Sequence, residues 1–78
     1  MLGRSLREAR KRAGLSQAEV ARRAKTDRSY LSDLERDRQS PSVHLFIRIC
    51  RAMGTSAASV IRKAEESAGD GESKGGQT

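Results

Sequence analysis

The chain has 78 residues with 16 Lys+Arg against 10 Asp+Glu, a formal net charge of +6 and one cysteine. This length allows one domain with a modest core, and a lone cysteine excludes an internal disulfide framework. No apolar run is long enough to span a membrane and no secretory pattern follows Met1, so we expect a soluble cytoplasmic protein.

The charge is distributed unevenly along the chain. Residues 1–64 carry 15 Lys+Arg against 6 Asp+Glu, a formal charge of +9, whereas residues 65–78 carry 1 against 4, a charge of −3. A strongly basic surface attracts nucleic acid phosphates, although a basic amphipathic helix at an anionic membrane is an alternative source of the same charge. Because Tyr30 and Phe46 are the only aromatic residues, platforms for stacking unpaired bases are sparse, which favours duplex DNA.

The first two predicted helices lie on either side of Gly14. Apolar residues recur at helical spacing from about Gly3 to Ala13, and Gly14 suits the end of that helix. A second helix is expected to start at Ser16, because serine followed three residues later by Glu19 has the spacing of a capping box.

A third helix is predicted after Asp27, which is a good N-cap residue. Leu31 and Leu34 would face the core. The outward face would carry Arg28, Ser29, Ser32 and Asp33. Two short helices joined by a tight turn, the second offering short polar side chains from its first turn, form a unit that can enter the DNA major groove.

Two more helices and a tail complete the predicted organisation. The polar stretch around Pro41 is a loop, and Ser42 can cap a fourth helix that runs to about Met53. Ser56 can cap a fifth helix that runs from Ala57 to about Glu65, so the predicted fold class is all-α with five helices. Residues 1–66 would form the domain, and residues 67–78, rich in glycine and polar residues, a disordered tail. Cys50 lies on an apolar helix face, where a buried small side chain is favoured over a reactive thiol.

The order of these motifs resembles the phage-repressor-like helix-turn-helix regulators of the Cro/repressor or XRE type, over about residues 2–62. The matching residues are Leu6, Arg10, Gly14-Leu15-Ser16-Gln17, Ala21, Ser29-Tyr30-Leu31-Ser32, Leu34-Glu35, Pro41-Ser42 and Ala52-Met53-Gly54. Several spaced motifs in one order are far more specific than any single one. The short length and the segment 27–36 are also similar to the controller proteins of restriction-modification systems.

The resemblance implies specific roles. Gln17 would hold a DNA phosphate, and Arg10 and Glu35 would form a structural ion pair between the first and third helices. Base edges would be read by Arg28, Ser29, Ser32 and Asp33, whose side chains have the hydrogen-bonding chemistry for it. An ordinary solvated face is the alternative for each residue alone, but their clustering favours readout.

Three further residues are candidate phosphate contacts. Arg36 and Arg38 follow the third helix, where positive charge would meet the DNA backbone. Tyr30 is ambiguous, because its ring could pack inside while its hydroxyl reaches a phosphate. The chain also departs from the family pattern at two positions: Lys25 and Asp37 stand where glycine is common, so both are expected to adopt left-handed backbone conformations.

One such domain spans only a half-site, so we expect a homodimer on a palindromic or pseudo-palindromic operator. We expect the interface to lie on the apolar residues Met53, Val60 and Ile61, with closure of the core as the alternative for each. No catalytic constellation, cofactor motif, metal-ligand cluster or small-molecule site stands out, so the sequence predicts a regulator and not an enzyme. The rival function is a protein-interaction module of the same fold, such as an antitoxin-like or anti-repressor-binding protein.

Overall fold

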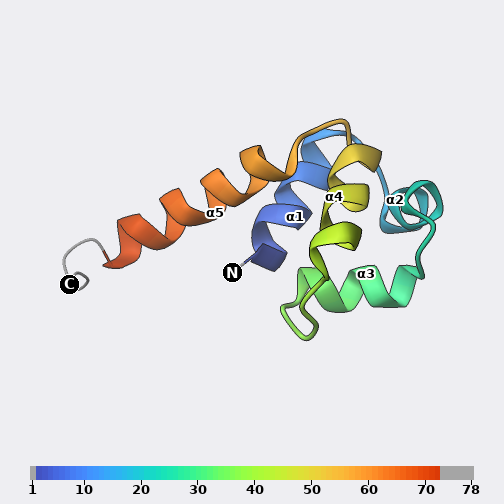
Figure 1. The fold of residues 1–78 in the computed structure, drawn as a ribbon, viewed down its shortest axis with the longest axis horizontal. Helices are drawn as coiled ribbons and strands as arrows, with labels where there is room; N and C mark the ends of the chain where they lie inside the picture. Colours follow the sequence, from blue (N-terminus) through green and yellow to red (C-terminus); the bar gives the residue numbers. More distant parts are fainter. Residues whose placement is uncertain (1, 73–78) are drawn as a thin grey trace.

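The computed structural model describes residues 2–72 and contains five α-helices within this range, with no strand (Figure 1). They are α1 Leu2–Arg12, α2 Gln17–Ala24, α3 Arg28–Glu35, α4 Val43–Ala52 and α5 Ala57–Glu72. This confirms the predicted all-α class and the order of the elements. In the described range, no helix combines the length and the apolar character needed to cross a membrane.

Three serines begin helices as the sequence predicts. The Oγ atoms of Ser16, Ser42 and Ser56 each accept a hydrogen bond from the backbone N–H three residues later, at 3.0–3.1 Å. Each bond satisfies a backbone donor that a helix start leaves without an intrahelical partner. Asp27 occupies the N-cap position of α3 with extended backbone, but its side chain makes no capping hydrogen bond.

The first four helices end in the same backbone motif. A residue one or two positions after each helix terminus has a positive φ: Gly14 at 73°, Lys25 at 60°, Asp37 at 59° and Gly54 at 75°. The N–H of each donates to a carbonyl three residues back, and the next N–H donates to a carbonyl five residues back, the pattern of a Schellman cap. The expected left-handed conformations of Lys25 and Asp37 are therefore confirmed.

All five helices contribute to one apolar core. Its fully buried large members are Leu6, Val20, Leu31, Leu34, Ile49, Cys50 and Val60. Burial of Cys50 confirms the structural interpretation of this residue and raises the pKa of its thiol from 9.0 to about 11. A thiol with this pKa stays protonated and unreactive at neutral pH.

Helix α1 approaches the end of α3 so closely that only glycine fits at the contact. A Cβ atom on Gly3 would lie 2.5 Å from the carbonyl oxygens of Leu34 and Glu35. The backbone N–H of Gly3 donates a hydrogen bond to Oδ1 of Asp37 at 3.0 Å. The start of the first helix is thus held against the end of the third.

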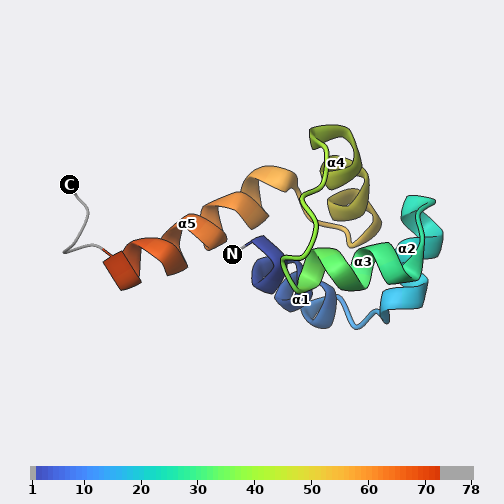
Figure 2. The same ribbon diagram turned by 90° about the horizontal axis from the view of Figure 1, so that it is seen from below.

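Helix α5 is longer than predicted. It continues to Glu72, so the prediction that residues 67–72 belong to a disordered tail was wrong; the remainder of that tail, residues 73–78, lies outside the described residues. Two glycines in the last turns cost about 1 kcal/mol each, but Glu65, Glu66 and Ala68 favour continuation of a helix already formed. The first half of α5 packs on the domain, and its second half projects away from it (Figure 2).

Candidate nucleic-acid interface

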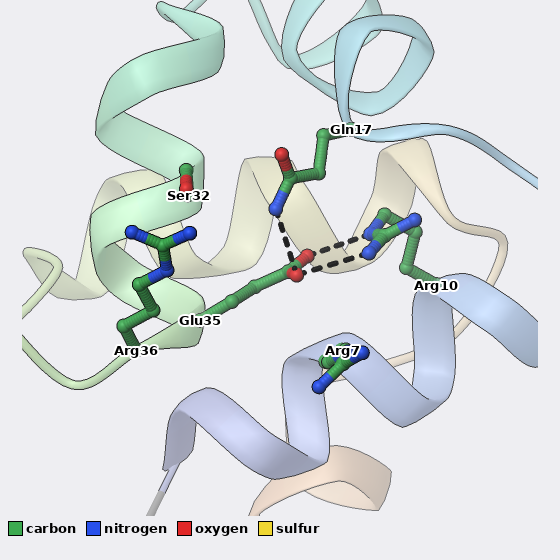
Figure 3. Close-up of a pocket in the computed structure, with 6 residues that line it drawn as sticks. All are labelled: Arg7, Arg10, Gln17, Ser32, Glu35 and Arg36. Carbon is green, nitrogen blue, oxygen red and sulfur yellow. Dashed lines mark hydrogen bonds and ion pairs between the residues drawn. The ribbon is translucent and has the colours of Figure 1, made fainter.

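A buried carboxylate at the end of α3 connects three helices. Nε and Nη2 of Arg10 donate to the two carboxylate oxygens of Glu35 at 2.7 and 3.0 Å, a bidentate pair. Nε2 of Gln17, the first residue of α2, donates to Oε1 of Glu35 at 3.0 Å (Figure 3). Nη1 of Arg10 donates to the carbonyl of Leu15 in the turn between α1 and α2, also at 3.0 Å.

The pair is well shielded from water: the side chains of Arg10 and Glu35 are 12% and 4% exposed. The hydrogen bond with Glu35 raises the pKa of the Arg10 guanidinium above its ordinary value, against the opposing effect of burial. A shielded bidentate pair resists screening by salt better than an exposed one. The predicted ion pair is therefore present and stands at the junction of α1, α2 and α3.

A hollow of about 220 Å³ lies beside this pair. It is lined by Arg7, Arg10, Gln17, Ser32, Glu35 and Arg36. Arg7 comes from α1 and Arg36 follows α3, and in Figure 3 no interaction joins either guanidinium group to the buried carboxylate of Glu35. Two exposed guanidinium groups beside an amide and a hydroxyl suit an anion such as a phosphate.

A second hollow, of about 280 Å³, follows the outer face of α3. Its lining residues are Gln17, Arg28, Ser29, Ser32, Asp33 and Arg36. Arg28, Ser29 and Arg36 are exposed, and Ser32 and Asp33 are half-buried. Since Gln17, Ser32 and Arg36 line both hollows, the start of α2 and the outer face of α3 form one continuous polar surface, which we call the α2–α3 face.

Two predicted contact residues, Tyr30 and Arg38, lie outside the lining of the two hollows. Tyr30 is half-buried and packs against the core, which agrees with the inward packing expected of its ring; contact of its hydroxyl with a phosphate stays a prediction. Arg38 is exposed, and its backbone N–H closes the cap of α3 through the carbonyl of Asp33 at 2.8 Å. Neither side chain is part of the lining of either hollow.

Sequence reasoning missed Arg7 and Arg48. Arg7 lies one helical turn before Arg10, and this i,i+3 spacing was the available signal. Arg48 of α4 donates from Nη2 to the carbonyls of Ala24 and Lys25, at 2.5 and 3.0 Å, and so holds the turn between α2 and α3. This contact joins residues 23 or more positions apart, and no local pattern indicates it.

The predicted dimer residues divide between core and surface. Met53 is 7% exposed and Val60 is 2% exposed, both within the core, so assigning these two side chains to an interface was wrong. They complete a core that five short helices need, which was the stated alternative. Ile61 is 41% exposed and remains available on the surface.

Among the described residues, no three or more His, Cys, Asp or Glu side chains are grouped so that they could hold a metal ion. The α2–α3 face combines donors with positive charge, a chemistry suited to the DNA backbone and to base edges.

The family is shown by a model of the helix-turn-helix domain that matches residues 1–60. An immunity repressor protein of Bacillus phage phi105 is 33% identical over 60 residues, which are 77% of this chain and 42% of that repressor. The chain thus spans less than half of the length of this relative.

Solved structures of regulators share the fold. The clp gene regulator ClgR from Corynebacterium glutamicum is 38% identical with a TM-score of 0.82, over 85% of this chain and 70% of ClgR. The restriction-modification controller protein C.AhdI from Aeromonas hydrophila is 30% identical with a TM-score of 0.73, over 76% of this chain and 89% of C.AhdI. The biofilm regulator SinR, solved in complex with DNA, is 31% identical with a TM-score of 0.73, over 78% of this chain and 98% of that SinR chain. With the α2–α3 geometry, these matches show that the chain belongs to the helix-turn-helix family of DNA-binding transcriptional regulators.

Proposed function

We propose that this chain reads a specific duplex operator as a homodimer, with the outer face of α3 in the major groove and one half-site per protomer. The observation that carries the proposal is the continuous α2–α3 face, on which Arg28 and Ser29 are exposed at the start of α3. The first turn of a recognition helix is the part that reaches base edges in this motif.

The bases are read by four side chains. Arg28 suits a bidentate contact to guanine, and Ser29 and Ser32 suit single hydrogen bonds to several bases. Asp33 accepts a hydrogen bond from cytosine and disfavours bases that offer only acceptors at that position. The operator thus combines a guanine opposite Arg28 with a cytosine opposite Asp33.

The phosphates are held by a separate set of side chains. Gln17 lies at the N-terminus of α2, where the helix dipole favours an anion, and its amide is already oriented by Glu35. Arg7 and Arg36 add positive charge around the same hollow, and Arg38 extends it beyond α3. These contacts fix the register of α3 and carry no sequence information themselves.

Two protomers related by a twofold axis would present two copies of α3 to half-sites about 34 Å apart. A single copy offers only a few base contacts, each worth about 1–3 kcal/mol of discrimination. A dimer doubles that number and makes the operator palindromic or pseudo-palindromic.

The test is selection of bound sequences from a random duplex pool, followed by affinity measurements on the winner across a range of salt concentrations. Arg28→Ala is compared with Arg62→Ala, because both remove one exposed positive charge but Arg62 lies on α5, outside both hollows. We expect an inverted-repeat winner, and about ten- to a hundredfold weaker, less selective binding by Arg28→Ala.

Failure to enrich any sequence, or binding that does not change with salt, would overturn the proposal in favour of a protein-interaction role. Enrichment of a site without twofold symmetry would reject the homodimer but not the reading of bases by α3. Equal losses in Arg28→Ala and Arg62→Ala, with unchanged sequence preference, would remove Arg28 from the base contacts.

A further inference from the structure

The guanidinium group of Arg48 binds two successive carbonyls where α2 ends and the turn to α3 begins. Its Nε and Nη2 atoms donate to the carbonyl of Ala24 at 3.2 and 2.5 Å, and Nη2 also donates to the carbonyl of Lys25 at 3.0 Å. Ala24 is the last residue of α2, and Lys25 is its C-cap. A planar group with several donors can bridge two carbonyls in a fixed geometry, which the point charge of a lysine ammonium does not provide.

These two carbonyls are not bound by the backbone cap that ends α2. In that cap the N–H groups of Lys25 and Thr26 donate to carbonyls three and five residues back. A helix end leaves its last four carbonyls without intrahelical partners, so the later ones need a donor from elsewhere. Ala24 is 2% exposed, and a buried carbonyl without a partner is costly. Arg48 therefore completes the cap from another helix, and its positive charge is favourable at a helix C-terminus.

Two features of the turn itself increase its dependence on Arg48. Lys25 has a left-handed backbone, with φ 60° and ψ 50°, a conformation that lysine adopts less readily than glycine. Asp27, at the N-cap position of α3, makes no side-chain capping hydrogen bond. The turn is thus strained at its first residue and lacks the usual side-chain bond at its last.

We propose that Arg48 is a positioning residue for the reading of DNA: it keeps Lys25 in its left-handed conformation and so fixes the direction in which α3 leaves α2. The inference rests on the reading of bases by α3 proposed above. Only residues 25–27 separate α2 from Arg28, so a change of backbone at Lys25 rotates the first turn of α3 against α2.

Such a rotation affects base contacts and phosphate contacts differently. Hydrogen bonds to base edges weaken steeply with distance and angle, whereas the attraction between an arginine and a phosphate falls off slowly with distance. Loss of the Arg48 contacts should therefore reduce selectivity for the operator more than it reduces general attraction to DNA.

The test compares Arg48→Met with Arg51→Met. Both variants remove one exposed positive charge from α4 and keep an unbranched side chain, but the hydrogen bonds to the turn come from Arg48. Circular dichroism establishes the temperature range in which both variants are folded, and all measurements are made within it.

The first measurement is amide hydrogen exchange without DNA. We expect the Lys25 and Thr26 amides to exchange about tenfold faster in Arg48→Met than in the native chain or in Arg51→Met. The amide of the buried Val60 in α5 should be unchanged. Unchanged exchange at the turn, or equal acceleration at Val60, would overturn the proposal.

The second measurement is binding to the selected operator and to a scrambled duplex of the same length, across a range of salt concentrations. We expect Arg48→Met to bind the operator about tenfold more weakly than Arg51→Met does. The two variants should bind the scrambled duplex alike and share one salt slope. Equal losses on both duplexes, or a slope smaller by about 2, would make Arg48 a phosphate contact and overturn the proposal.

Lys25→Gly tests the part of the proposal that concerns the backbone of the turn. Because glycine adopts the left-handed conformation readily, Lys25→Gly introduced into Arg48→Met should recover about threefold of the lost operator affinity. Lys25→Gly in the native chain is the control for the removed charge. No recovery would overturn the role given to Lys25. Because exchange is measured without DNA, faster exchange at the turn with no enriched operator would reject base reading by α3 and not the contact of Arg48 with the turn.

Discussion

At the scale of single residues, Glu35 has the largest structural role in the site. Its carboxylate accepts hydrogen bonds from Arg10 and Gln17, and it is the only charged side chain that is buried among the described residues. A buried charge is tolerated because it is paired and hydrogen-bonded, and removal of one partner leaves the other unpaired in a shielded position.

Arg10→Met is therefore expected to destabilise the fold by about 3 kcal/mol, as measured by urea unfolding. Arg4→Met is the control, because the Arg4–Glu8 pair has side chains 80% and 52% exposed and its loss should cost less than about 1 kcal/mol. DNA binding by Arg10→Met should weaken mainly through the unfolded fraction. Unchanged unfolding together with lost DNA binding would refute the structural role.

Cys50 provides a pH-dependent prediction. Since burial raises its pKa from 9.0 to about 11, the folded state keeps the thiol protonated at pH values where the unfolded state ionises it. The stabilising contribution is complete below pH 9 and is lost as the pH rises through 11. The free energy of unfolding should fall by about 2 kcal/mol more in the native chain than in Cys50→Ala over this interval. Parallel losses in the two proteins would contradict this assignment.

At the scale of elements, the sequence predicted what depends on local chemistry. Helix periodicity and the serine caps were correct, because each follows from residues within one or two turns. The left-handed conformations of Lys25 and Asp37 were expected from the family pattern, in which glycine is common at both positions. The Arg10–Glu35 pair was predicted from the resemblance. The end of α5 was placed too early, because glycine and polar residues suggested a tail where the structure continues the helix.

What the sequence could not supply are contacts between distant elements. Arg48 and the turn after α2 are brought together only by packing of α4, and Arg7 lines the hollow beside Glu35 only when α1 lies beside α3. For the same reason Met53 and Val60 were not separable from Ile61: all three are apolar residues near the α4–α5 turn, and three-dimensional packing decides which remain exposed.

A substitution at Gly3 tests how closely α1 approaches the end of α3. In the interior of a helix, replacing glycine by alanine normally stabilises by about 1 kcal/mol. Here the added Cβ would lie 2.5 Å from two backbone carbonyl oxygens, which have little freedom to move. Gly3→Ala should therefore lower the free energy of unfolding by about 1–3 kcal/mol, a reversal of sign that thermal melting can detect. A stabilised variant would show that α1 and α3 are not held this closely in solution.

At the scale of the whole molecule, the charge of the domain governs how DNA binding responds to salt. Arg7, Arg36 and Arg38 are the proposed cationic phosphate contacts, and each occurs twice in a dimer. The slope of log K against log salt should then be about −5.

Arg7→Ala should reduce the magnitude of that slope by about 2, one for each protomer, and should weaken binding to all duplexes alike. Arg62→Ala, on α5, is the control with the same charge change and should leave the slope nearly unchanged. An unchanged slope in Arg7→Ala would remove α1 from the DNA interface.

Because Glu35 holds Gln17 in place, residues of the α2–α3 face differ in how freely they can be substituted during evolution. Substitutions at Glu35 or Arg10 would disturb the fold and the orientation of Gln17, the proposed phosphate contact, together, so we expect little freedom to vary at these positions. Arg28 and Ser29 are exposed and support no part of the core, so they can be exchanged at little cost in stability. New operator preferences can therefore arise, or be engineered, by exchanging residues on the outer face of α3 while the rest of the domain is kept.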